Sequence, residues 1–201
     1  MSEPRIGRVL VASLHQAIAD LLPGRLEFYE NWLNSSGLRE GTIGLAPLSA
    51  VLSFLRNEGE AYNLITARAG EYAADWTVGD MSVLRRRVIS ALPSRIRARL
   101  ALGKARALVR ATYPGSRAIV RLRRGRASID LRGSLFCEVR QASALPLCGF
   151  YAAAVARMLE HFRLRADAHV DECRAAGRRK GCLLGVVMHM KRAESAAGPS
   201  S

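Results

Sequence analysis

The chain has 201 residues, of which 49% are apolar, and a formal net charge of +14. This length and apolar content suit one domain with a sizeable core, and no apolar run reaches the roughly 18 residues that would span a bilayer. Four cysteines are too few for a disulfide scaffold in a chain this long, so reduced thiols or a metal site are expected.

The first eight residues lack the apolar core and cleavage site of a secretion signal, which predicts a cytoplasmic protein. Most of the positive charge comes from arginine. Such a charge attracts anions, which include nucleic acids, acidic membrane surfaces, carboxylated ligands and acidic proteins. A genome rich in G and C would produce the same composition, so the charge by itself selects no partner.

Apolar residues at helical spacing predict six helices in the first 112 residues. They cover residues 6–22, 25–33, 47–57, 60–76, 81–92 and 94–112. A turn-rich loop is expected at 34–44, and Asp80 is expected to cap the helix 81–92. In the helix 94–112, Ile96, Leu100, Leu108 and Val109 give an apolar side. Its arginines lack the interleaved aromatic residues of a nucleic-acid surface, so a nucleic-acid partner is not favoured.

The period of the pattern changes after residue 115. Residues 117–123 and 126–132 alternate around a glycine turn and predict a β-hairpin with one apolar and one arginine-rich face. A short extended piece at 135–139 and a helix at 145–162 follow. A second hairpin is expected from 169–173 and 182–190.

This order predicts an α+β fold, with N-terminal helices packed on an antiparallel sheet of about four strands. We expect a single domain over 1–190, with a helical part (1–113) and a sheet-containing part (114–190). A disordered tail is expected at 191–201.

The segment from Pro146 to Cys182 carries a spaced motif. It reads Pro-x-Cys-x-Phe-Tyr at the start of a helix, then an extended run, then Cys-x-x-x-Gly and a further cysteine before a final strand. This motif resembles the 4-vinyl reductase domain family, which includes bacteriochlorophyll 4-vinyl reductase-like proteins. Its superfamily also contains ligand-binding domains in NO signalling, phenol-type bacterial sensors and TRAPP vesicle-tethering subunits. The resemblance is best over residues 133–188 and extends weakly to 69–76 and 92–93.

A zinc site is predicted from Cys148, Cys173 and Cys182, because cysteines that flank a hairpin loop and open a helix can converge. The alternative is that all four cysteines are small buried residues of the core. In the phenol-type sensors the resemblance implies a glutamate as fourth ligand, three residues before the second cysteine. That position is Val170 here.

The fourth zinc ligand is predicted to be Asp171, because on a regular strand this residue shares a face with Cys173. The residues left open as substitutes are Glu172, His169 and Cys137.

A hydrophobic pocket is predicted between the helix 145–162 and the helix around Gly70. Its expected ligand-binding residues are Gly70, Leu147, Tyr151, Val155 and Met158. The resemblance implies such a pocket for hydrocarbons, acyl chains or tetrapyrroles. A packed core without a cavity would show the same apolar pattern.

No nucleotide-cofactor motif and no nucleophilic triad is visible, so no catalytic residue is predicted and an enzyme is not favoured. The resemblance suggests a small-molecule-binding protein that binds or delivers a tetrapyrrole intermediate in bacteriochlorophyll biosynthesis, and hence serves photosynthesis. One alternative is a TRAPP-like interaction module that dimerises, and whose basic helix 94–112 meets an acidic protein or a membrane surface. Another is a hydrocarbon-sensing domain with a structural zinc.

Overall fold

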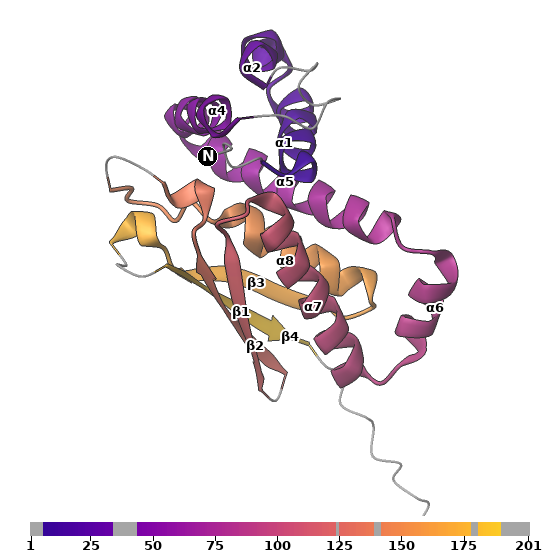
Figure 1. Ribbon diagram of the computed structural model, residues 1–201. Coiled ribbons are helices and arrows are strands. Elements are labelled where there is room, and N and C mark those ends of the chain that lie inside the picture. The colour runs from indigo at the N-terminus through magenta and orange to yellow at the C-terminus, as the bar shows by residue number, and fades with distance from the viewer. Residues whose placement is uncertain (1–5, 34–43, 124, 139–141, 178–180, 190–201) are drawn as a thin grey trace, which may run out of the picture.

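The computed structural model describes residues 6–33, 44–123, 125–138, 142–177 and 181–189 (Figure 1). These residues form seven α-helices and one four-stranded antiparallel sheet, which confirms the predicted α+β fold. The α-helices are α1 (Arg8–Leu21), α2 (Leu26–Leu33), α4 (Leu45–Asn57), α5 (Glu60–Gly79), α6 (Val83–Ala91), α7 (Ser94–Thr112) and α8 (Gly149–His161). The strands are β1 (Arg117–Arg123), β2 (Arg126–Arg132), β3 (Ala166–Glu172) and β4 (Cys182–Met188). The predicted tail at 191–201 and most of the loop at 34–44 lie outside the described residues.

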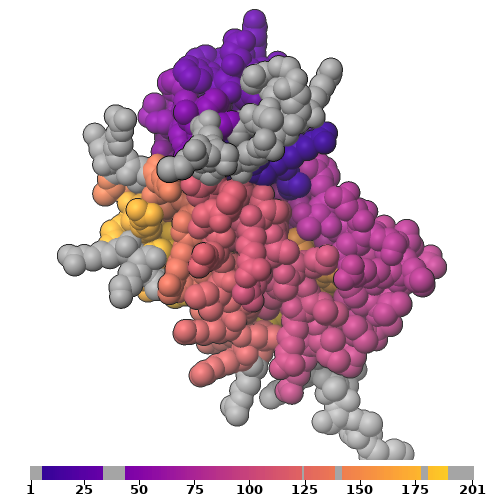
Figure 2. All heavy atoms as spheres, viewed as in Figure 1, coloured from indigo at the N-terminus to yellow at the C-terminus, as the bar shows by residue number. Residues whose placement is uncertain are grey.

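The helices α1, α2 and α4 gather at one end of the molecule (Figure 2). The long helix α5 connects this end to the rest, since it packs on α1 and on α8. It continues to Gly79 instead of ending at residue 76, and the N–H of Asp80 donates to the carbonyl of Trp76. The cap of α6 is therefore Ser82, whose hydroxyl accepts from the N–H of Arg85, and not Asp80. No described helix is long and apolar enough to cross a membrane.

The buried side of α7 differs from the predicted one. Ile96 and Leu100 are 44% and 40% exposed, although Leu108 and Val109 are buried as expected. Between residues 98 and 105 the buried face consists of Leu102 and three alanines, namely Ala98, Ala101 and Ala105. Helix α7 packs against α8 and β1, and in this part of the helix the side chains it buries are mainly small.

The sheet has the strand order β1-β2-β4-β3, and both predicted hairpins are confirmed. One inward row contains Val120, Ile129, Leu184 and Val170, which are paired across all four strands. Helices α7 and α8 contact β1 and β3, respectively, on this inward side (Figure 1). A β-bulge between Val170 and Glu172 interrupts the pairing of β3 with β4.

The segment before α8 is not helical, although the predicted helix began at residue 145. The helix starts at Gly149, with Cys148 at its N-cap. The carbonyl of Leu147 accepts from the hydroxyl of Tyr62 at 2.9 Å, and its N–H donates to the Sγ of Cys173 at 3.4 Å. These tertiary bonds use the backbone groups that a longer helix would need. The piece expected to be extended at 135–139 contains instead a short 3₁₀ turn, Leu135–Cys137.

Candidate metal centre and its surroundings

The four cysteines of the chain meet at one end of the sheet. Cys137 ends the 3₁₀ turn, Cys148 precedes α8, Cys173 follows β3 and Cys182 begins β4. Their Sγ atoms all lie within 4.8 Å of one another, and all four residues are buried. Four segments separated in sequence are thus joined at a single point.

The distances between the sulfurs suit a single metal ion. The Sγ of Cys137 lies 2.9 Å from that of Cys148, 3.3 Å from that of Cys173 and 3.2 Å from that of Cys182. The Sγ of Cys182 lies 3.0 Å from Cys148 and 3.8 Å from Cys173. Sulfurs around a tetrahedral zinc ion, each at about 2.3 Å from it, lie roughly 3.8 Å apart. The cluster reaches that geometry if its short sides expand by less than about 1 Å.

Two of the sulfurs have the surroundings of thiolates. The N–H of Leu147 donates to Cys173 Sγ at 3.4 Å, and the N–H of Arg174 donates to Cys182 Sγ at 3.3 Å. Hydrogen bonds from the Cys137 and Cys148 thiols, together with these N–H groups, lower the pKa of Cys173 and of Cys182. The same contacts raise the pKa of Cys148, whose thiol proton is shared with its neighbours. The site thus favours negative sulfur at two positions, as metal ligation requires.

The β-bulge in β3 determines which side chains near the end of this strand face the sulfur cluster. Ala168 and Val170 face inward, whereas His169 and Asp171 are exposed on the outer face. On a regular strand Cys173 would also face outward, but the extra residue at the bulge turns it inward, where it is 4% exposed.

Asp171, the predicted fourth ligand, therefore lies apart from the sulfurs. Its carboxylate contacts His169 Nε2 at 2.8 Å, over Gly185 of β4. The structure brings Cys148, Cys173 and Cys182 together as predicted, and Cys137 occupies the fourth place. In the sequence analysis Cys137 was only one of several alternatives to Asp171 as the fourth zinc ligand. The signal that favours it is the ligand count, because Cys₄ is a common set for structural zinc.

The donor set restricts the chemistry that the centre can perform. Four sulfurs in a tetrahedral arrangement fit zinc or a single iron, and thiolates select against magnesium and calcium. All four positions around an ion would be filled by protein atoms, and the residues are buried. A closed site of this kind stabilises a fold and leaves no open position for a substrate or water.

The residues predicted to bind a ligand belong to the core beside this centre. A side chain at Gly70 would meet the carbonyl oxygen of Phe150 at 2.1 Å, so α5 and α8 are in backbone contact there. Tyr151, Val155 and Met158 are each at most 3% exposed. Burial raises the pKa of Tyr151 to about 12, and its hydroxyl lies 3.2 Å from that of Thr112.

Three buried aromatic rings pack together in the segments that carry Cys137 and Cys148, and of these Phe136 and Phe150 were not predicted as site residues. Phe136 and Phe150 are stacked with ring centroids 5.0 Å apart, and Tyr151 packs edge-on against both rings at 5.5 and 5.2 Å. Each of these residues is adjacent in sequence to a cysteine or to another ring. These aromatic residues could have been predicted to meet, because they lie close in sequence to Cys137 and Cys148 and these two cysteines come together.

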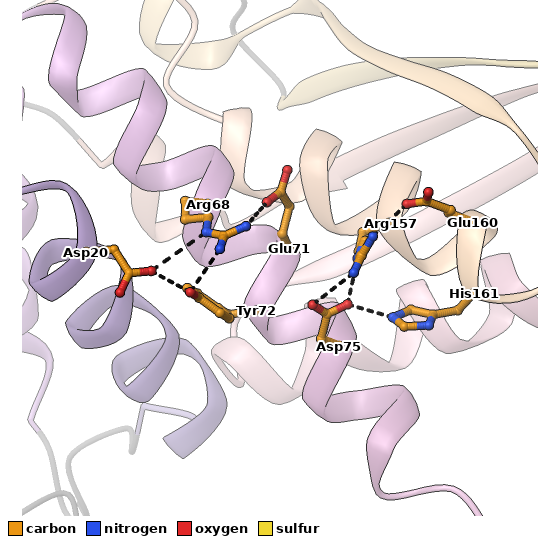
Figure 3. A network of polar contacts seen from close by, with 8 residues as sticks. All are labelled: Asp20, Arg68, Glu71, Tyr72, Asp75, Arg157, Glu160 and His161. Carbon is orange, nitrogen blue, oxygen red and sulfur yellow. Dashed lines mark hydrogen bonds and ion pairs between the residues drawn. The ribbon is translucent and has the colours of Figure 1, made fainter. Parts of the chain in front are cut away.

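A surface hollow of about 510 Å³ lies where α5, α8 and β3 meet. Charged side chains of α5 and α8 form a network beside it (Figure 3). Asp75 accepts from Arg157 Nε at 2.7 Å and contacts His161 Nε2 at 2.6 Å, and Arg157 also contacts Glu160 at 2.8 Å. Burial opposes the charge on Asp75, but the bonds from Arg157 and His161 outweigh it and hold the pKa of Asp75 below its usual value.

A second group of charges joins α5 to α1 at the other end of this network (Figure 3). Arg68 contacts Glu71 at 2.9 Å and Tyr72 at 3.1 Å, and the Tyr72 hydroxyl donates to Asp20. Two more hollows, of about 580 and 360 Å³, lie beside α7. None of these three hollows, as lined by described residues, contains a predicted ligand-binding residue.

Comparison with known proteins identifies relatives by structure only. No protein-family model matches the chain, and no curated protein matches it. Among solved structures, a variant H-NOX protein from K. algicida in its unliganded Fe(II) state has a TM-score of 0.57 at 12% identity, with 92% of this chain and 98% of that chain covered. An H-NOX protein from S. oneidensis in the Fe(II)NO state has a TM-score of 0.56 at 9% identity, with 92% and 100% covered.

The phenol-responsive sensory domain of the transcription activator PoxR, solved with phenol, is a third match. Its TM-score is 0.51 at 14% identity, with 71% of this chain and 74% of that chain covered. At these identities the matches establish a common fold. The chain shares its α+β architecture with H-NOX proteins and with a phenol-responsive sensory domain.

Proposed function

We propose that this protein is a small-molecule-binding domain whose ligand-binding half is held together by a structural zinc ion. The observation that carries the proposal is the convergence of Cys137, Cys148, Cys173 and Cys182 within 4.8 Å. Buried thiols of a purely apolar core have no reason to gather from four segments around one point. A zinc ion there would join the start of α8 to β3 and β4.

The ligand class is inferred from the fold and from the residues around the sulfurs. PoxR, which shares the fold, was solved with phenol, and this chain contains the stacked rings of Phe136 and Phe150 with Tyr151 edge-on to both. We assign the ligand to the predicted apolar region between α8, the sheet and the helix α5. Its walls would be Gly70, Leu147, Tyr151, Val155 and Met158, with the aromatic rings beside them.

A small aromatic or hydrocarbon ligand would displace less of this packed region than a tetrapyrrole would. Ligand sites commonly occupy about 300 to 1,000 Å³, and a tetrapyrrole needs space towards the upper end of this range. The backbone contact at Gly70 keeps α5 and α8 together, so the larger ligand would have to separate them. A role related to 4-vinyl reductase proteins and bacteriochlorophyll biosynthesis is therefore the second candidate.

Two measurements on the purified protein test this function. Elemental analysis for zinc and iron should give about one ion per chain, with zinc as the metal. Calorimetric titration with phenol should show binding, and a parallel absorbance titration with magnesium protoporphyrin should show no shift. Binding of the porphyrin but not of phenol would reverse the order of the two candidates. A protein that binds neither compound and contains no metal would contradict the proposed function.

A further inference from the structure

The outer face of the sheet is uncovered and has a charge pattern with two halves. Helices α7 and α8 cover the inner face, while every described outward side chain of the four strands is at least partly exposed. The half formed by β1 and β2 carries five outward arginines, which are Arg117, Arg121, Arg123, Arg126 and Arg132. The opposite edge, β3, presents Asp167 and Asp171.

The strand register places these opposite charges at the same level of the sheet. One row across the strands contains Arg123, Arg126, Val187 and Asp167 in that order. The charge therefore changes from positive to negative along a single row. Within the chain the two ends of the row are separated by β2 and β4, so Arg123 and Asp167 cannot pair with each other.

The basic half is only partly neutralised by its own carboxylates. Arg132 pairs with Asp130 at 3.2 Å. For Arg121, Arg123 and Arg126, no carboxylate of the described residues lies within 4.0 Å. In the acidic half, the carboxylates of Asp167 and Asp171 contact histidines, His189 at 2.7 Å and His169 at 2.8 Å. Both halves thus present charge that a complementary surface could pair.

Partly buried apolar residues on β4 lie between the two charged halves, namely Leu183 and Val187. Within the basic half, Ile119 on β1 adds an apolar side chain that is 43% exposed. Together with Gly185, Leu183 and Val187 leave the middle of the face with little charge and low relief. An apolar centre flanked by charges is typical of a protein–protein contact.

We propose that two copies of this chain associate through this outer sheet face. A two-fold axis in the plane of the contact and parallel to the strands places β1 of one copy over β3 of the other, and β2 over β4. Arg123 then faces Asp167 of the partner subunit, and by symmetry the same contact forms twice. A two-fold axis across the strands would instead place β1 over β1, so arginine would meet arginine.

The size of the face predicts a weak dimer. Four strands of seven residues, spaced about 4.8 Å apart with a rise of about 3.3 Å per residue, cover on the order of 400 Å². A standard stable interface buries about 800 Å² on each partner. Since much of the attraction is between exposed charges, raising the ionic strength from about 0.05 to 0.5 M should weaken the dimer at least about tenfold.

A charge-swap experiment tests the proposal on the full chain. The first variant combines Arg121→Glu with Arg123→Glu and places acidic side chains on both edge strands, β1 and β3. The second combines Asp167→Arg with Asp171→Arg and places basic side chains on both edge strands. In sedimentation velocity at low salt, each variant alone should be monomeric at concentrations where the parent forms dimers. An equimolar mixture of the two variants should form a heterodimer, because each face then complements the other.

A control separates this face from the general positive charge of the protein. Arg85→Glu with Arg87→Glu changes the charge by the same amount on exposed residues of α6, away from the sheet, and should leave the parent dimer intact. Circular dichroism and melting curves establish that each variant is folded. A parent that is monomeric at low salt, a mixture that stays monomeric, or a control that also abolishes dimers would overturn the proposal. The proposal would also be overturned if the parent were monomeric and its arginine-bearing strands bound a polyanion instead.

Discussion

The two ends of helix α8 are held in different ways. At its N-terminal end, Cys148 lies in a buried cluster of sulfurs that joins the helix to the sheet. At its C-terminal end, Arg157 and His161 reach across the surface to Asp75 of α5. The backbone of α5 at Gly70 contacts the first turn of α8, at the carbonyl of Phe150. A buried cluster of thiols, which binding of one ion would stabilise, therefore contrasts with a surface network that contributes little and depends on salt and pH.

Disruption of the cysteine cluster at the N-terminal end of α8 should have the largest effect on stability. Cys173→Ser removes one thiolate ligand and should release zinc, because three sulfurs bind the ion much less tightly. We expect a loss of about 3 kcal/mol or more, which corresponds to a decrease on the order of 10 °C in Tm for a domain of this size. A chelator should lower the Tm of the parent similarly and leave the variant unchanged, as measured by thermal melts with and without chelator. A parent melt that ignores the chelator would instead assign the cysteines to core packing.

The identity of the fourth ligand can be decided by a matched pair of variants. Cys137→Ser should abolish stoichiometric zinc, whereas Asp171→Asn should retain it, because Asp171 lies on the outer face with His169. Substitution with Co²⁺ provides the measurement, since the intensity of the sulfur-to-cobalt absorption reports the number of thiolates. Unchanged absorption in the Cys137 variant together with loss in the Asp171 variant would restore the carboxylate to the site.

The contact between Gly70 of α5 and the first turn of α8 should respond less strongly. In Gly70→Ala the new methyl group would lie 2.1 Å from the carbonyl oxygen of Phe150, so α5 and α8 must move apart. We expect destabilisation of about 2 to 3 kcal/mol, measured by urea unfolding. The control is Gly103→Ala in α7, where no atom lies within 4 Å of the added carbon. This control should gain about 0.5 to 1 kcal/mol from its higher helix propensity. A stable Gly70 variant would mean that the helices separate readily, as admission of a large ligand requires.

Loss of the charged contacts at the C-terminal end of α8 should have the smallest effect on stability, and this effect should depend on pH. Asp75→Asn should cost at most about 1 kcal/mol at neutral pH, because the contacts are partly exposed. The pKa of Asp75 is lower in the folded chain than its ordinary value, so its contribution is present above the ordinary pKa and is lost as pH falls through the folded-state pKa. Urea unfolding at neutral and strongly acidic pH should therefore give a difference between parent and variant that disappears in acid. A difference that persists in acid would assign the effect to packing.

Several features could be predicted from local pattern alone. The alternation of residues 117–123 and 126–132 identified the first hairpin, and the apolar stripe of α8 correctly identified Tyr151, Val155 and Met158 as buried. These features depend on the periods of strand and helix, which neighbouring residues determine. The α+β class followed from the order of the elements. The division into a helical part and a sheet-containing part at residue 113, and the assignment of residues 1–190 to a single domain, stay predictions.

The tertiary structure decided the features that depend on contacts between distant segments. One extra residue in β3 turned Cys173 inward and left Asp171 outside, and no period in the sequence signals a bulge that is defined by its pairing with β4. The start of α8 moved to Gly149 because the backbone of Leu147 bonds to Tyr62 and Cys173. Cys137 joined the cluster because a 3₁₀ turn replaced the expected strand. The sequence by itself determined that cysteines would meet near the start of α8, and only the packing of four segments determined which atoms surround the centre.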